Sequence, residues 1–212
     1  RTMLKRRSMP MPQKNKSVYS SYIKDMPFLF LETRKAAKLV ADGTAIDSIV
    51  SLSTEQNIFQ LDKEKRRLKL AQKVASRLSV LSVGQINVLA TASEETAKLI
   101  TFYAVIKTDF LFFEFMKDVY SEKQNLGQYD IEDKDIISFL RSKEEIAKWT
   151  DNNFVRVKNT YKAILCEAGL ATRNGSALKI QKPIADDFLQ DAFPLTDSYT
   201  VAMGLEVLDE NA

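Results

Sequence analysis

The chain has 212 residues, a formal net charge of +3 at pH 7 and an apolar fraction of 45%. It contains one cysteine, Cys166, and no histidine, which excludes an internal disulfide framework, structural zinc and Ser-His or Cys-His catalytic triads. Six glycines and five prolines leave little room for long irregular stretches, so we expect a mainly α protein of a reducing, cytoplasmic compartment.

In chain order, the elements divide the sequence into five stretches. They are a basic flexible tail (1–17), a helix-turn-helix-like helical domain (18–83), a helical middle that packs on both neighbours (84–128), a winged-helix-like domain with a small β-hairpin (129–192) and an acidic tail (193–212). The N-terminus is basic and polar with no apolar run behind it, so no secretory signal is visible.

The first helical stretch has the order of a helix-turn-helix unit. Helix-spaced apolar residues over 28–42 end at Gly43, a short helix is expected over 45–52, and a third helix over 62–81. In that third helix, seven basic residues stand against one acid, Glu64, between positions 63 and 77. An angular step of about 100° per residue groups Leu68, Ala71, Val74, Ala75 and Leu78 on one side, and Lys65, Arg66, Lys69, Lys73 and Arg77 on the other.

A helix face with one sign of charge favours a polyanion such as a nucleic acid. The alternative is a solvated helix whose lysine side chains extend into water and bind nothing.

The middle stretch contains the most apolar run, residues 100–120. Lys107, Asp109, Glu114 and Lys117 interrupt it, so we interpret it as one central buried helix and expect no membrane association. Ser93 is expected to cap the helix that leads into this run.

The last folded stretch begins with an acid-started helix over 129–140 and a short helix over 142–149. A further helix over 150–169 presents Asn152, Arg156 and Asn159 on its outer face, with Lys162 at the margin. Asparagine and arginine are the side chains that pair bidentately with adenine and guanine edges. Two short strands around an Asn174-Gly175 turn then form a wing carrying Arg173, Asn174 and Lys179. The alternative is a helix-to-hairpin corner with incidental polarity.

Five short segments resemble the BrxA family of the BREX bacteriophage-resistance systems. They are FLFLETR at 28–34, the Asp42-Gly43 turn, RRLKLAQKVASRL at 66–78, WTD at 149–151 and LCEAGL at 165–170, and the resemblance covers most of residues 18–185. It implies a non-enzymatic, largely helical, cytoplasmic antiviral-defence protein with helix-turn-helix character that binds double-stranded DNA, with other BREX components as further partners. The family has also been compared with an RNA-binding antitermination factor.

An enzymatic function is not expected. The sequence has no phosphate-cradling glycine loop, and the helix dipole explains the acids at 130–135 in a first helical turn. We therefore expect no catalytic residues, no metal, no cofactor and no small-molecule substrate. Two functions of different classes remain: a DNA-binding accessory protein, or a protein–protein adaptor of the defence complex. An RNA-binding, antitermination-like factor is the further alternative to DNA.

Overall fold

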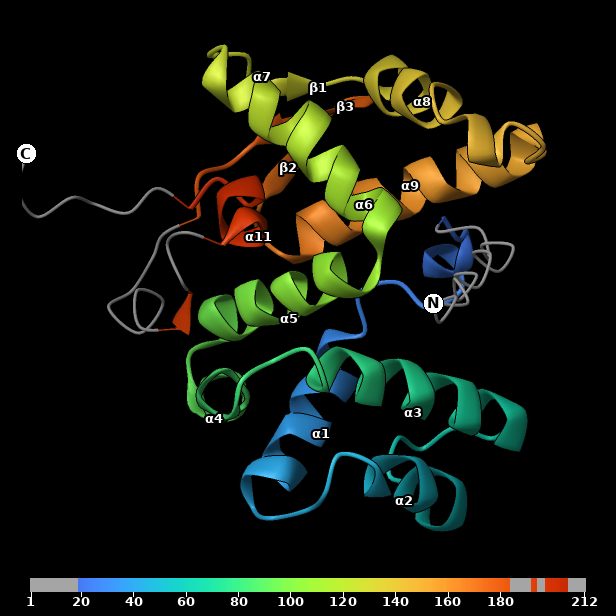
Figure 1. Ribbon diagram of the computed structural model, residues 1–212, viewed down its shortest axis with the longest axis vertical. Helices are drawn as coiled ribbons and strands as arrows, with labels where there is room; N and C mark the ends of the chain where they lie inside the picture. The colour runs from blue at the N-terminus through green and yellow to red at the C-terminus, as the bar shows by residue number, and fades with distance from the viewer. Residues whose placement is uncertain (1–18, 184–191, 194–196, 206–212) are drawn as a thin grey trace, which may run out of the picture.

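The computed structural model describes residues 19–183, 192–193 and 197–205. Helices α1 to α4 form a lower lobe, the elements from α6 to β3 form an upper lobe, and α5 lies between them (Figure 1). The chain is mainly helical with one small antiparallel sheet, which confirms the predicted fold class at that level.

The lower lobe contains α1 (Phe30–Ala41), α2 (Ser48–Gln56), α3 (Glu64–Leu78) and α4 (Val83–Thr91). Helix α3 packs against α1, α2 and α5. The predicted helices at 28–42 and 62–81 are confirmed by α1 and α3, and α2 begins three residues later than expected. Gly43 follows α1 with a φ of 99°, a conformation that glycine adopts without steric cost.

The middle of the chain is a helix broken at Asp109. Helix α5 (Glu94–Thr108) begins at the predicted cap, where Ser93 Oγ accepts a hydrogen bond from Thr96 N at 3.2 Å. Helix α6 (Phe110–Phe115) continues without interruption into the π-helical segment η2 (Met116–Ser121) and α7 (Glu122–Asn125).

The prediction of one unbroken buried helix over 100–120 is wrong, because the Asp109 backbone is extended and its carboxylate caps α6 through Phe112 N at 3.0 Å. In the part of the chain that the structure describes, no helix has the length and apolar character needed to cross a bilayer.

The upper lobe holds β1 (Asp130–Ile131), α8 (Asp133–Arg141), the 3-10 turn η3 (Glu144–Ile146), α9 (Asp151–Glu167), β2 (Ala171–Asn174) and β3 (Ala177–Ile180). The strands form an antiparallel sheet in the order β1-β3-β2. Strand β1 was not predicted and occupies the start of the predicted 129–140 helix, and the predicted 142–149 helix contains only η3. Asn174 pairs with Ala177, so the tight turn is Gly175-Ser176, one residue later than predicted.

Aromatic packing fixes α9 against the middle of the chain. The ring centroid of Tyr161 on α9 lies 4.4 Å from that of Phe112 and 5.2 Å from that of Phe115, both on α6. All three side chains are buried. This contact sets the rotation of α9 and therefore decides which of its residues reach the surface.

The ends of the chain are described in part. The predicted basic tail (1–17) lies outside the described residues. The 3-10 turn η1 (Tyr22–Lys24) packs against α9. Helix α11 (Ser198–Ala202), within the predicted acidic tail 193–212, packs against α5 and η2.

Candidate nucleic-acid interface

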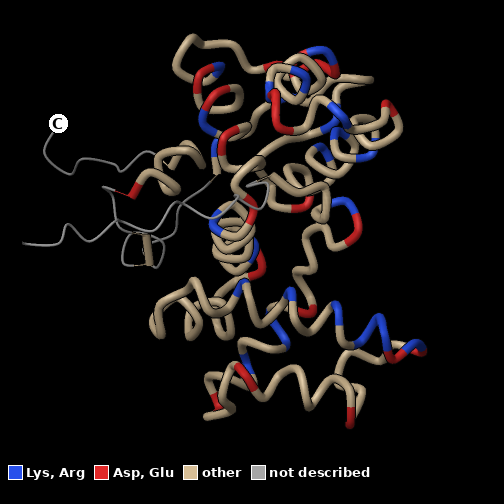
Figure 2. The backbone as a smooth tube through the Cα atoms, turned by 45° about the vertical axis from the view of Figure 1, so that its right-hand side comes forward, with Lys and Arg blue, Asp and Glu red and all other residues tan. Residues whose placement is uncertain are grey.

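The N-terminal half of α3 presents three cations to solvent. Lys65, Arg66 and Lys69 are exposed, as the sequence predicted. Across the described ranges, no carboxylate lies within ion-pair distance of any of the three. Figure 2 shows blue Lys and Arg positions gathered along this helix, which projects from the lower lobe. This half of α3 is therefore a surface of positive charge that the described part of the chain does not neutralise.

The C-terminal half of α3 turns toward the interior. Lys73 is half-buried, and burial together with the nearby Arg77 guanidinium lowers the pKa of its ammonium. Asp109 faces both cations from the α5–α6 break. Burial raises the pKa of the Asp109 carboxyl to about 6, against the opposing effects of the Phe112 N–H and the two cations. Lys73 thus lies at the edge of the exposed surface, and its charge partly compensates that of the buried Asp109 carboxylate.

The prediction that Arg77 lies on the outer face of α3 is wrong. Its side chain is 0% exposed, and its guanidinium donates hydrogen bonds to the backbone carbonyls of Met26, Pro27 and Phe28, that of Met26 at 3.2 Å. Burial lowers the pKa of this group to about 10, so the guanidinium still carries its charge at neutral pH. Arg77 holds the segment that joins η1 to α1 and is not available to an external ligand.

Helix α9 presents the predicted polar face. Thr150 Oγ1 accepts a hydrogen bond from Asn153 N at 3.3 Å and caps the helix, and Phe154, Val157 and Tyr161 on the opposite side are buried. The residues predicted to point outward do so at three positions: Asn152, Arg156 and Asn159 are exposed.

The side chain of Arg156 is 51% exposed and its guanidinium makes an ion pair with Asp25 at 3.2 Å. On the same side, Lys24 Nζ donates to Asn153 Oδ1 at 2.7 Å. Both contacts come from the segment around η1, which precedes α9 by more than a hundred residues in the chain. The sequence contained no signal for this packing, so Lys24 and Asp25 were not among the predicted site residues.

Lys162, predicted at the margin of the outer face as a DNA-binding residue, is buried. Lys162 is only 7% exposed, and its ammonium donates hydrogen bonds to Asp133 Oδ1 at 2.6 Å and to the backbone carbonyl of Ser176. Lys158 donates to the other oxygen of the same carboxylate. These hydrogen bonds lower the pKa of the Asp133 carboxyl. Lys162 therefore ties α9 to the start of α8 and to the hairpin turn.

The hairpin exposes the three polar side chains expected of a wing. Arg173 and Asn174 lie on β2 and Lys179 on β3, and all three are exposed. Figure 1 places the N-terminal ends of α3 and α9 on the same side of the molecule, one on each lobe. The structure thus brings the N-terminal ends of α3 and α9 to one side of the molecule, and it buries Arg77 and Lys162, two of the predicted site residues.

A family profile and a sequence relative agree on the family. The BrxA family profile matches residues 17–193. A Bacillus cereus protein described as "BREX protein BrxA" is 35% identical over 171 residues, which cover 79% of this chain and 86% of the relative. A crystal structure of an uncharacterized protein from Magnetospirillum magneticum has a similar fold, with a TM-score of 0.66 at 19% identity over 82% of this chain and 90% of that one. The chain therefore belongs to the BrxA family of BREX proteins.

Proposed function

We propose that the protein binds double-stranded DNA as a non-enzymatic component of BREX phage defence. The observation that carries this proposal is the exposed cluster Lys65, Arg66 and Lys69, which the described part of the chain leaves without an acidic partner. Cations that no carboxylate neutralises gain most from phosphate, because each contact releases condensed counterions from the duplex.

The polar face of α9 supplies the second part of the proposed interface. The order α8, η3, α9 and hairpin, with β1 added to the sheet, supports a winged-helix interpretation in which α9 enters the major groove. Asn152, Arg156 and Asn159 would face base edges, while Arg173, Asn174 and Lys179 would contact the backbone from the wing. The α1–α3 unit, with helix-turn-helix order, would add phosphate contacts from the lower lobe.

A salt titration tests this function directly. Fluorescence anisotropy with a labelled random-sequence duplex should show binding that weakens steeply between about 50 and about 200 mM salt, because each phosphate contact contributes about 0.9 to the slope of log K against log salt. With contacts from α3 and the wing, we expect a slope of about −3 to −5. Double-stranded and single-stranded RNA of the same sequence are the comparison ligands. Preferential RNA binding would favour the antitermination-like alternative, and no binding to any of the ligands at low salt would favour the adaptor.

The Asp25–Arg156 ion pair gives a second test. Arg156 must leave this carboxylate to reach DNA, so Asp25→Asn should raise duplex affinity about two- to fivefold, the amount that a surface ion pair withholds. Arg156→Ala should lower affinity about tenfold or more at preferred sites. In the double variant the gain from Asp25→Asn should shrink, since its partner is absent. If Arg156→Ala leaves the affinity unchanged on every duplex tried, α9 is not a recognition helix.

A further inference from the structure

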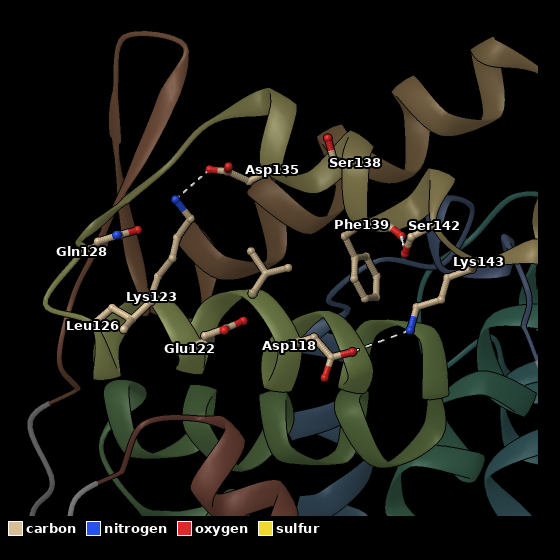
Figure 3. A pocket seen from close by; sticks show the side chains of 11 residues that line it. Asp118, Glu122, Lys123, Leu126, Gln128, Asp135, Ser138, Phe139, Ser142 and Lys143 are labelled. Carbon is tan, nitrogen blue, oxygen red and sulfur yellow. Dashed lines mark hydrogen bonds and ion pairs between the residues drawn. The ribbon is translucent and has the colours of Figure 1, made fainter.

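A groove of about 510 Å³ lies in the upper lobe between the η2–α7 segment and α8. We call it the α7–α8 groove. Its walls carry Asp118, Glu122 and Leu126 on one side and Phe139 on the other (Figure 3), and Val119 of η2 also lines it. It lies at the opposite end of the molecule from α2 and α3 (Figure 1), so the proposed DNA surface of the lower lobe does not include it.

The α7–α8 groove presents negative charge to a bound ligand. Lys123 Nζ lies 2.9 Å from Asp135, and Lys143 Nζ lies 2.9 Å from Glu114 and 3.6 Å from Asp118, so internal carboxylates already neutralise both lysines. Glu122 is exposed and has no ion pair within the described ranges. A guest would therefore meet the carboxylate of Glu122 and the partly compensated carboxylate of Asp118.

Apolar side chains lie beside these acids. Leu126 is 65% exposed at one end of the groove, Val119 is half-buried on the same side, and Phe139 lines the opposite side. Covering an exposed leucine beside a concave surface with a second apolar side chain is favourable, because it removes apolar surface from water. The groove therefore offers an apolar contact and a carboxylate close to each other.

The wall of the groove has an unusual backbone. Asp118 and Val119 belong to η2, a π-helical segment within the otherwise α-helical run from Phe110 to Asn125. Turns of π-helix are rare, and they occur frequently at functional sites. Residues 116–121 contain neither glycine nor proline that would account for the widening.

We propose that the α7–α8 groove binds a segment of a partner protein in which a lysine or arginine lies beside a leucine-like side chain. The cation would pair with Glu122 and Asp118, and the apolar side chain would cover Leu126 and Val119. The volume accommodates a few side chains, not a folded domain. The inference is independent of DNA binding, because it uses none of the residues assigned to the nucleic-acid interface.

Selection of a random peptide library on the purified full chain tests the proposal. The peptides are displayed on yeast, because libraries linked to nucleic acid could bind α3 through the nucleic acid. Enriched peptides should contain Lys or Arg next to Leu, Ile or Phe. Measured by anisotropy with a labelled enriched peptide, Glu122→Lys and Leu126→Asp should each lower affinity by about tenfold or more. Both residues are exposed, so these variants are expected to keep the wild-type thermal melt.

The matched controls are Glu55→Lys and Leu31→Asp, which make the same changes at exposed positions of the lower lobe and should leave peptide affinity unchanged. Enrichment of acidic peptides, no enrichment, or equal loss in the controls would overturn the proposal. Selected peptides that match residues 1–16 of this chain, or a dimer that Glu122→Lys dissociates, would assign the groove to the chain itself and also overturn it. If the unmodified chain binds the enriched peptides but binds no duplex, the DNA proposal is refuted and the groove proposal stands.

Discussion

Replacing Arg77 with Met is expected to destabilise the folded protein by about 3–5 kcal/mol, the cost typical of removing one member of a buried charged network. Methionine fills much of the same volume but donates no hydrogen bond. The carbonyls of Met26, Pro27 and Phe28 would then lose their donors in a buried environment, and the Asp109 carboxyl would lose a facing cation. Urea unfolding followed by circular dichroism at neutral pH measures the difference.

Arg66→Met is the matched control, since it makes the same substitution on an exposed turn of the same helix. We expect its free energy of unfolding to stay within about 0.5 kcal/mol of wild type. In a duplex-binding assay the order is expected to reverse. Arg66→Met should weaken binding, and Arg77→Met, measured at a low temperature at which it stays folded, should not. Equal stability of the two variants would show that the Arg77 contacts are energetically unimportant.

The error about Arg77 shows where sequence reasoning on this protein ends. A uniform helical wheel placed Arg77 with the outward cations and Leu68 with the core. In the structure Arg77 is buried and Leu68 is partly exposed. The partner that decides this is the backbone at residues 26–28, about fifty positions earlier in the chain. No local pattern shows that a loop from another part of the fold will need a donor at this point.

The burial of Lys162 and the formation of β1 were not predicted for the same physical reason, because both depend on contacts with distant parts of the chain. Lys162 lies at the margin of a polar face, and only the tertiary position of Asp133 turns it inward. The strand β1 has two residues and exists because β3 offers it an edge. In contrast, the end of α1 and the starts of α5 and α9 follow from local chemistry, namely the glycine after α1 and the hydroxyl caps of Ser93 and Thr150. Those features were predictable from the sequence.

The break at Asp109 lies between these two cases. In the sequence, Asp109 stands out only as a charge that argues against a membrane span. Aspartate is also a strong helix cap, and here its carboxylate accepts the Phe112 N–H and starts α6. A local signal was therefore available, but the continuous apolar pattern of residues 100–120 concealed it. The change of direction at this residue orients α6, against which Tyr161 of α9 packs.

Reversing the three exposed charges of α3 should have the largest effect on DNA binding. The variant in which Lys65, Arg66 and Lys69 are all replaced by Glu is expected to bind a random duplex at least about a hundredfold more weakly at low salt. The salt slope should also fall in magnitude by about 3, because three phosphate contacts at about 0.9 each are lost. Anisotropy titrations at several salt concentrations give both quantities from one experiment, and the exposed positions should leave the melting temperature close to wild type.

The control carries the same change in net charge on another surface. Lys35, Lys38 and Lys117 are exposed on α1 and η2, and their replacement by Glu alters the overall charge equally while leaving the N-terminal half of α3 intact. If the long-range field of the protein were responsible for duplex binding, both triple variants would lose affinity and salt dependence alike. If direct phosphate contacts on α3 are responsible, only the α3 variant loses the salt slope, because counterion release depends on which cations contact the duplex and not on the total charge. Equal losses would therefore remove α3 from the interface even though the protein binds DNA.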